Sequence, residues 1–176
     1  MRPLFVTGLS IASAVGAGLE RTFAALREGR GGLRRNDFEP FPHATWIGRV
    51  DGLESAPVAG AQARFDCRNN RLAQLALAQD GFIDAVAACA ARWGRERVGL
   101  FLGTSTSGML ETEIAYRHRD AQSGALPARL DYAGTHNTYS LGAFARELLA
   151  LEGPSAVVSS ACSSSAKVFG SAQRMI

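Results

Sequence analysis

The segment EGPSAVVSSACSSSAKVFG, residues 152–170, decides the fold of this chain. A Glu-Gly-Pro stop at 152–154 precedes a short apolar run that predicts a strand over 156–159. A helix-compatible segment begins near Ser163, so Cys162 stands at a strand-to-helix corner. The start of a helix carries unpaired N–H groups and a positive dipole end, which favour negative charge on a thiolate or on a thioester oxygen. Two interpretations stay open at this point: a nucleophile, or a small structural cysteine.

The sequence on the N-terminal side of this segment alternates short apolar strands with helices. Residues 30–62 are rich in glycine, proline and charge, and we expect them to form a loop. The strands are expected at 4–6, 98–102 and 156–159, and the helices at 17–28, 70–92, 108–121, 138–151 and from 163 onward. This alternation predicts an α/β layer with a largely parallel sheet.

The composition is that of an ordinary soluble globular domain. The chain has 176 residues, of which 47% are hydrophobic and 20% charged. This length is enough to bury one core without the help of disulfides or metal ions. Its three cysteines, Cys67, Cys89 and Cys162, are far apart, and its three histidines are scattered. We therefore expect no disulfide framework, no metal site, no cofactor and a reduced, cytoplasmic setting.

The net charge of +3 is carried almost wholly by arginine. The basic residues form separate small groups at 34–35, 64–71 and 117–119 rather than one stripe. This distribution does not suggest nucleic-acid binding, whereas it would suit an acidic protein partner or simply a solvated surface.

The first eighteen residues, MRPLFVTGLSIASAVGAG, imitate a secretory signal because an early arginine precedes an apolar stretch. However, Thr7-Gly8 interrupts that stretch and residues 19–28 continue as an amphipathic helix, so a strand-turn-helix start is the better account. No other segment approaches the roughly 20 apolar residues of a membrane span, and we expect no membrane association.

Two other segments are candidates for chemistry. Residues 103–108, GTSTSG, share the outer glycines of a phosphate loop but are followed by Met109 rather than lysine. They do not form a serine-hydrolase elbow either, because Ser107 stands where that pattern needs glycine. His136 could supply an imidazole base, although a histidine at a surface or helix entry is the more ordinary interpretation.

Three segments of the chain together resemble one enzyme family. They are VTGLSIASAVGAGLERTFAALREG at 6–29, VGLFLGTSTSG at 98–108 and EGPSAVVSSACSSSAKVFGSAQRMI at 152–176. In this order they resemble the β-ketoacyl-acyl carrier protein synthases, the decarboxylating condensing enzymes of fatty-acid and polyketide synthesis in the thiolase superfamily. The third segment resembles the nucleophile signature of that family, in which G-P-S, a short strand and A-C-S-S-S follow one another.

The resemblance implies a thiolase-like layered α/β fold with a mixed, mostly parallel sheet. Residues 1–176 would be the N-terminal ketoacyl-synthase half-domain, cut after the nucleophile helix begins, with the C-terminal half absent. In the family two histidines and a lysine that follow the cysteine complete the site. Neither the three histidines nor Lys167 occupies those positions, so we expect this chain alone not to carry out the condensation.

The resemblance also implies roles for single residues. Cys162 would accept an acyl group from an acyl carrier protein and, in the parent enzyme, pass it to a malonyl-carrier thioester with loss of carbon dioxide. Thr106 and Ser107 would lie at the acyl pocket, and many relatives have a bulkier aliphatic residue in place of Thr106. Arg64, Arg68 and Arg129 would face the acidic carrier protein. The parent protein would act as a homodimer or heterodimer.

Other interpretations share the same residues. A chain-length-factor-like partner would have the fold without the chemistry, but such partners usually lack the cysteine. An initiating condensing enzyme or a biosynthetic thiolase shares the nucleophile and would differ in its acyl donor. An unrelated acyltransferase with a sulfur nucleophile is a further alternative.

Overall fold

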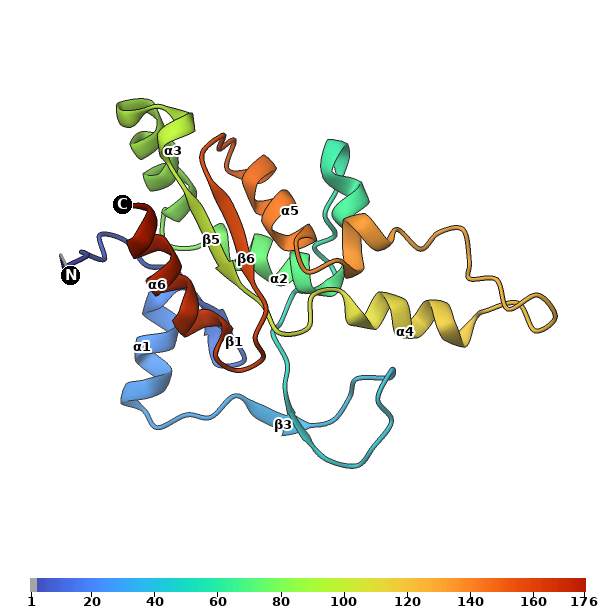
Figure 1. The fold of residues 1–176 in the computed structure, drawn as a ribbon. Helices are drawn as coiled ribbons and strands as arrows, with labels where there is room; N and C mark the ends of the chain where they lie inside the picture. The colour runs from blue at the N-terminus through green and yellow to red at the C-terminus, as the bar shows by residue number, and fades with distance from the viewer. Residues whose placement is uncertain (1–2) are drawn as a thin grey trace.

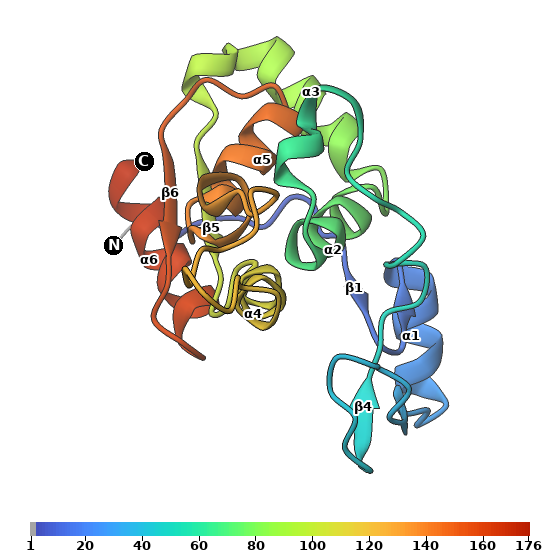
Figure 2. The ribbon, with the colours of Figure 1, turned by 90° about the vertical axis from the view of Figure 1, so that its right-hand side faces the viewer.

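A parallel pair of strands forms the centre of the computed structural model, which describes residues 3–176. Strand β5 (Leu100–Gly103) pairs with β6 (Ser155–Val158), and the register runs from Leu100 opposite Ser155 to Gly103 opposite Val158. Helices α5 (Ser140–Leu148) and α6 (Ser164–Met175) lie on opposite faces of this pair (Figures 1 and 2). The predicted layered α/β arrangement is therefore present around the cysteine segment.

Glycines let both helices approach the strands closely. A Cβ on Gly103 would lie 2.7 Å from the carbonyl carbon of Ser164 at the start of α6. On the other face, a Cβ on Gly142 of α5 would lie 2.7 Å from a methyl carbon of Val157. Because real Cβ atoms do not come so near to backbone or branched side chains, glycine at these two positions sets the spacing of the layers.

The remaining elements precede the strands or join them (Figure 1). Two antiparallel hairpins, β1–β2 and β3–β4, lie in the N-terminal part and form two-stranded sheets of their own, separate from the parallel pair of β5 and β6. These elements are β1 (Ala12–Ser13), β2 (Gly16–Ala17), α1 (Leu19–Arg27), β3 (Leu33–Arg35), β4 (Trp46–Gly48), the 3-10 turns η1 (Gly60–Phe65) and η2 (Arg95–Arg97), α2 (Arg68–Leu77), α3 (Phe82–Trp93), α4 (Met109–Arg117) and the π-helical turn η3 (Tyr132–His136).

The core consists of two apolar clusters that share α5 and its C-terminal end. The first contains Val58, Phe65, Leu141 and Phe144, and the second contains Ala90, Leu149 and Leu151. Helix α5 therefore holds the turn η1 at one end and helix α3 at the other. This packing fixes β5 and β6 beneath it.

The predicted buried strand at 4–6 is wrong for this structure. Phe5 and Val6 are 85% and 76% exposed, and residues 3–11 adopt no regular structure. An apolar run becomes a strand only when a neighbouring strand accepts its hydrogen bonds, and within residues 3–176 no strand pairs with this segment.

The predicted single helix over 70–92 is also wrong, because it is two helices. Asp80 and Gly81 have φ of +57° and +68°, in the left-handed region that ends a helix. Helices α2 and α3 meet there at a bend of 74°. Within residues 3–176, no single helix is long and apolar enough to cross a membrane, and this bent pair reaches that length and composition only when its two helices are taken together.

Further boundaries differ from the sequence-based expectation, and the helix expected over 138–151 spans only Ser140–Leu148. Residues 30–62, expected to be loop, contain the hairpin β3–β4, which projects from the rest of the chain (Figure 2). Helix α4 ends at Arg117 rather than at 121, because His118 leaves the helical conformation and an Asp120-centred turn follows.

Candidate active site

Cys162 lies at the corner between β6 and α6. The strand ends at Val158 and the helix begins at Ser164, so five residues make the whole turn. Ala161 has φ of +53°, a left-handed conformation that costs a non-glycine residue about 1–3 kcal/mol. The turn is therefore sharp, and it leaves the Cys162 side chain exposed.

Hydrogen bonds among serines hold this corner. The Ser160 N–H donates to Ser164 Oγ at 2.8 Å, and Ser164 Oγ donates to the Ala161 carbonyl at 2.7 Å. Ser163 Oγ donates to the Ser160 carbonyl at 2.8 Å. These bonds satisfy backbone groups of the two residues that precede Cys162 with side chains of the two residues that follow it.

The start of α6 is suited to negative charge. The helix is 12 residues long, and its described first turn contains no acidic residue that would neutralise the positive dipole end. Charge that develops on the Cys162 sulfur, or on the oxygen of a thioester under attack, would be stabilised there. The positive end of the α6 dipole therefore begins next to Cys162 in the chain.

The two other cysteines differ from Cys162. Cys67 is only 1% exposed, and burial raises the pKa of its thiol. Cys89 is exposed on α3, away from any strand-to-helix corner. The ordinary structural interpretation of a cysteine applies to Cys67, whereas Cys162 is exposed at a helix start.

The GTSTSG loop at 103–108 follows β5 beside this corner. Ser164 Oγ lies 3.4 Å from the Thr104 carbonyl, and this contact joins the loop to the turn that contains Cys162. Ser107 is buried with φ of +49°, and its hydroxyl donates to the Asn137 carbonyl at 3.1 Å and lies 3.3 Å from that of Thr135. The hydroxyl of Ser107 therefore holds the loop against η3.

Thr106, Ser107 and Arg68 line one cavity of about 360 Å³. Its apolar walls come from Phe38, Leu53, Leu72 and Met109, and Thr106 itself is exposed. Cys162 is not among the described residues that line it. The structure thus brings the two predicted pocket residues together and leaves the cysteine outside this cavity.

Arg64 and Arg129 line a second, smaller cavity of about 190 Å³, together with Asp66, Glu111 and Asp131. Arg64 forms an ion pair with Glu147 and lies over the ring of Phe65, whereas Arg68 in the other cavity donates to Glu54 at 3.0 Å. The three predicted carrier-binding arginines therefore lie in two places, and two of them already have acidic partners.

Glu111 lines both cavities, and burial raises the pKa of its carboxyl. His136 contacts Thr112 Oγ1 through Nδ1 and stacks on Tyr132 with ring centroids 5.1 Å apart. These contacts give His136 a structural setting at η3. Among residues 3–176, no group of three metal-ligating side chains is close enough to hold an ion.

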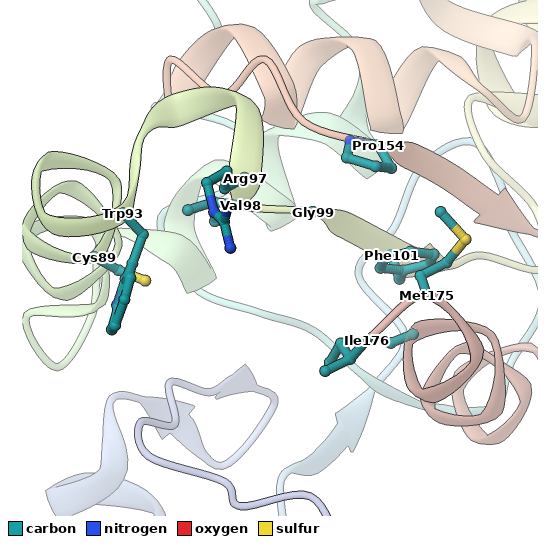
Figure 3. Close-up of a pocket in the computed structure, with 10 residues that line it drawn as sticks. Cys89, Trp93, Arg97, Val98, Gly99, Phe101, Pro154, Met175 and Ile176 are labelled. Carbon is teal, nitrogen blue, oxygen red and sulfur yellow. The ribbon is translucent and has the colours of Figure 1, made fainter.

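Sequence reasoning did not find an apolar groove of about 400 Å³ at the ends of α3 and α6. Figure 3 shows Trp93, Phe101, Met175 and Ile176 around it. Its residues come from helix ends and a strand that are far apart in the sequence, so no local pattern indicates it. Sequence reasoning also missed Ser164, whose burial depends on the approach of α6 to β5.

Comparison with known proteins agrees with this geometry. The sequence family described as the N-terminal domain of β-ketoacyl synthases matches residues 1–176. Among solved structures, the ketosynthase ApeO in complex with its chain length factor ApeC from Xenorhabdus doucetiae is similar at 27% identity, with a TM-score of 0.77 over 98% of this chain and 43% of that chain. A β-ketoacyl synthase from Burkholderia phymatum STM815 shares the fold, with 23% identity and a TM-score of 0.70 over 96% of this chain and 42% of that chain. The search of curated protein sequences found no match.

The chain spans about two-fifths of the length of these two solved structures. Their likeness confirms the predicted thiolase-like fold, and the family match covers every motif on which the resemblance rested. The chain therefore belongs to the β-ketoacyl synthase family of condensing enzymes, whose N-terminal domain it matches over residues 1–176.

Proposed function

We propose that this chain is the nucleophile-bearing part of a β-ketoacyl-acyl carrier protein synthase and that Cys162 accepts the acyl group. The observation that carries the proposal is the exposed Cys162 at a sharp strand-to-helix corner in a chain of this family. The Cys162 sulfur attacks the carbonyl of an acyl-carrier thioester, a new carbon–sulfur bond forms, and the carrier thiol leaves with the proton. The Cys162 N–H is one donor available to the oxyanion.

The second half of the proposed reaction belongs to the whole protein. Loss of carbon dioxide from a malonyl-carrier thioester yields a carbanion that attacks the acyl-Cys162 carbonyl, and the cysteine leaves as thiolate. We expect residues 1–176 alone to take up the acyl group but not to condense it. The three histidines have contacts elsewhere: His136 contacts Thr112, His118 contacts the Ile114 carbonyl, and His43 packs on the ring of Phe41.

Substrate contacts follow from the two cavities. Thr106 is an exposed residue of the larger one, whose apolar walls suit an acyl chain, and Ser107 holds the loop that contains them both. Arg64, Arg68 and Arg129 are proposed to face an acidic carrier protein. Its carboxylates would replace Glu147 as the partner of Arg64 and Glu54 as the partner of Arg68. A homodimer or heterodimer in the cytoplasm is part of the same proposal.

A second candidate is a non-catalytic partner subunit. The ketosynthase from Xenorhabdus doucetiae is in complex with a chain length factor, so partners of this kind occur beside such enzymes. Against this candidate, Cys162 is present and exposed, which a purely structural partner does not need. An initiating condensing enzyme or a thiolase would use the same cysteine with a coenzyme A thioester as donor.

The test is acylation of the full chain by an acyl-carrier protein, followed by mass spectrometry of its peptides. We expect the acyl mass on the peptide that contains Cys162 and none on the one that contains Cys89, which is equally free to solvent and is the internal control. Cys162→Ala should abolish the labelling. Acyl-coenzyme A offered in parallel separates the carrier-dependent enzyme from the thiolase, and absence of acyl-Cys162 with both donors would refute the proposal.

A further inference from the structure

The hydroxyl of Ser164 lies at the junction of three segments. Ser164 is 3% exposed, and its Oγ accepts the Ser160 N–H at 2.8 Å and donates to the Ala161 carbonyl at 2.7 Å. The same oxygen lies 3.4 Å from the Thr104 carbonyl at the end of β5. One buried oxygen thus contacts both residues that precede Cys162 and the loop beside it.

This position has a consequence for the strained residue. Ala161 holds a left-handed φ of +53°, which a non-glycine residue keeps only when its surroundings over-determine it. The Ala161 carbonyl accepts from both the N–H and the hydroxyl of Ser164, at 3.1 and 2.7 Å. The orientation of the peptide between Ala161 and Cys162, and with it the direction of the Cys162 N–H, depends on these two bonds.

Neighbouring serines do not duplicate this role. Ser163 is exposed, and within residues 3–176 its hydroxyl contacts only Ser160, through the carbonyl and the hydroxyl of that residue. Ser165 is exposed, and no hydrogen bond of its hydroxyl occurs among the same residues. In the part of the chain that the structure describes, only Ser164 has a hydroxyl that reaches Ala161, and its backbone is held beside β5 because residue 103 is glycine.

We propose that Ser164 is a positioning residue for Cys162: its hydroxyl fixes the left-handed Ala161 turn and so aims the Cys162 thiol and N–H. The inference rests on the proposed function, because it assigns a role to Ser164 in the acyl transfer. Without the hydroxyl, the Ser160 N–H and the Ala161 carbonyl lose a buried partner, and the turn relaxes toward conformations with negative φ. The thiol then adopts orientations in which the N-terminal end of α6 no longer stabilises negative charge on it.

The experiment compares Ser164→Ala with Ser165→Ala in the full chain, each checked for native circular dichroism. The rate of iodoacetamide alkylation at Cys162 is measured between pH 6 and 9 by peptide mass spectrometry, with Cys89 of the same molecules as the reference. Ser164→Ala is expected to slow the alkylation of Cys162 by roughly fivefold, the change in rate that corresponds to the loss of one hydrogen bond, and to change the pH dependence of that rate. The Cys89 rate should stay constant, Ser165→Ala should match the parent chain, and Ser164→Thr should restore the Cys162 rate.

The proposal is overturned if Ser164→Ala alkylates Cys162 at the parent rate across the pH range, or if Ser165→Ala has the same effect. If Ser164→Ala does not fold, amide hydrogen exchange on the parent protein decides, because the Ser160 N–H must then be protected; fast exchange there contradicts the proposal. Alkylation needs no carrier protein. If the parent chain shows no carrier-dependent acylation but the alkylation rate of Cys162 still depends on Ser164, the proposed function is refuted and the positioning role remains.

Discussion

Three cysteines of this chain occupy three different environments at the scale of single residues. Cys67 is buried and its thiol pKa is raised by burial, Cys89 is exposed on a helix, and Cys162 is exposed at the start of α6. The sequence predicted the corner at Cys162 because a glycine-proline stop, an apolar run and a helical segment follow one another locally. It could not predict that Cys67 is the buried one, because burial depends on contacts with Gly108, 41 positions away.

Glu111 allows a prediction at the same scale. Burial raises the pKa of its carboxyl, so the folded state binds this proton more tightly than the unfolded state. The stabilising contribution of protonation is fully present below the unfolded pKa and is lost as pH rises through the folded pKa, so at neutral pH the ionised carboxylate is a cost. Glu111→Gln is therefore expected to increase the free energy of unfolding at pH 7.

Urea unfolding at pH 7 and at pH 4 measures this gain. Glu113→Gln, on the exposed side of the same helix, is the matched control and should change little. A Glu111→Gln variant that is less stable than the parent at pH 7 and equal to it at pH 4 would show that the ionised form is favourable instead.

At the scale of elements, the packing of α6 on β5 decides the site. Gly103 ends β5 where the backbone of Ser164 and Ser165 passes, and this contact seats the first turn of α6 beside the GTSTSG loop. The sequence predicted both elements. It did not predict the distance between β5 and α6, which depends on the lack of a Cβ at Gly103.

Gly103→Ala tests this close approach. The added Cβ would lie 2.7–2.9 Å from backbone atoms of Ser164 and Ser165, so one element must move. We expect the free energy of unfolding to fall by about 1–3 kcal/mol and the alkylation of Cys162 to slow. Gly31→Ala, where a Cβ would meet nothing within 4 Å, should leave both unchanged. Equal stability of the two variants in urea would mean that α6 is free to shift.

Helices α2 and α3 show where a periodic pattern was insufficient. Their apolar residues continue through 70–92 at helical spacing, which predicted one helix, yet the structure ends α2 at Leu77 and starts α3 at Phe82. The Asp80-Gly81 pair favours left-handed backbone and is the local signal of this break. Packing of both helices around α5 then requires the bend.

At the scale of the whole molecule, a network of arginine–carboxylate pairs ties the projecting hairpin and its following loop to α2. Arg49 pairs with Asp37 and Glu54, Arg68 also pairs with Glu54, and Arg71 binds both oxygens of Asp66 at 2.6 and 2.7 Å. Asp66 additionally accepts the Val58 N–H at 2.9 Å. These pairs connect positions 37 to 71 at the surface, in addition to the buried apolar contacts of Val58 and Phe65.

This network predicts acid sensitivity. The hydrogen bond from Arg71 lowers the pKa of Asp66, and that from Arg49 lowers the pKa of Asp37. Because the folded carboxylates bind protons less tightly than the unfolded ones, their stabilisation is present above the unfolded pKa and is lost as pH falls through the folded pKa. The free energy of unfolding should therefore be steady between about pH 5 and 7 and fall below about pH 4.

Asp66→Asn should remove about 1.5–3 kcal/mol at pH 7 and flatten the decline below pH 4, because this carboxylate is then absent from the titration. Glu39→Gln, an exposed site in the loop between β3 and β4, is the control. Denaturation in urea across pH 2.5–7 measures both. An acid profile of Asp66→Asn that is identical to that of the parent would contradict the role of this pair.

The sequence by itself determined the central order of strand, cysteine and helix and the family to which the chain belongs, and it singled out Cys162 as the residue proposed to accept the acyl group. These features depend on neighbouring residues, such as the apolar run at 155–158 and the turn that follows it. The tertiary structure decided that residues 4–6 are not a strand, that Arg64 and Arg68 lie in different cavities, and that Ser164 is buried beneath Cys162. Each of these depends on contacts between segments that are distant in the sequence, which propensity and periodicity do not record.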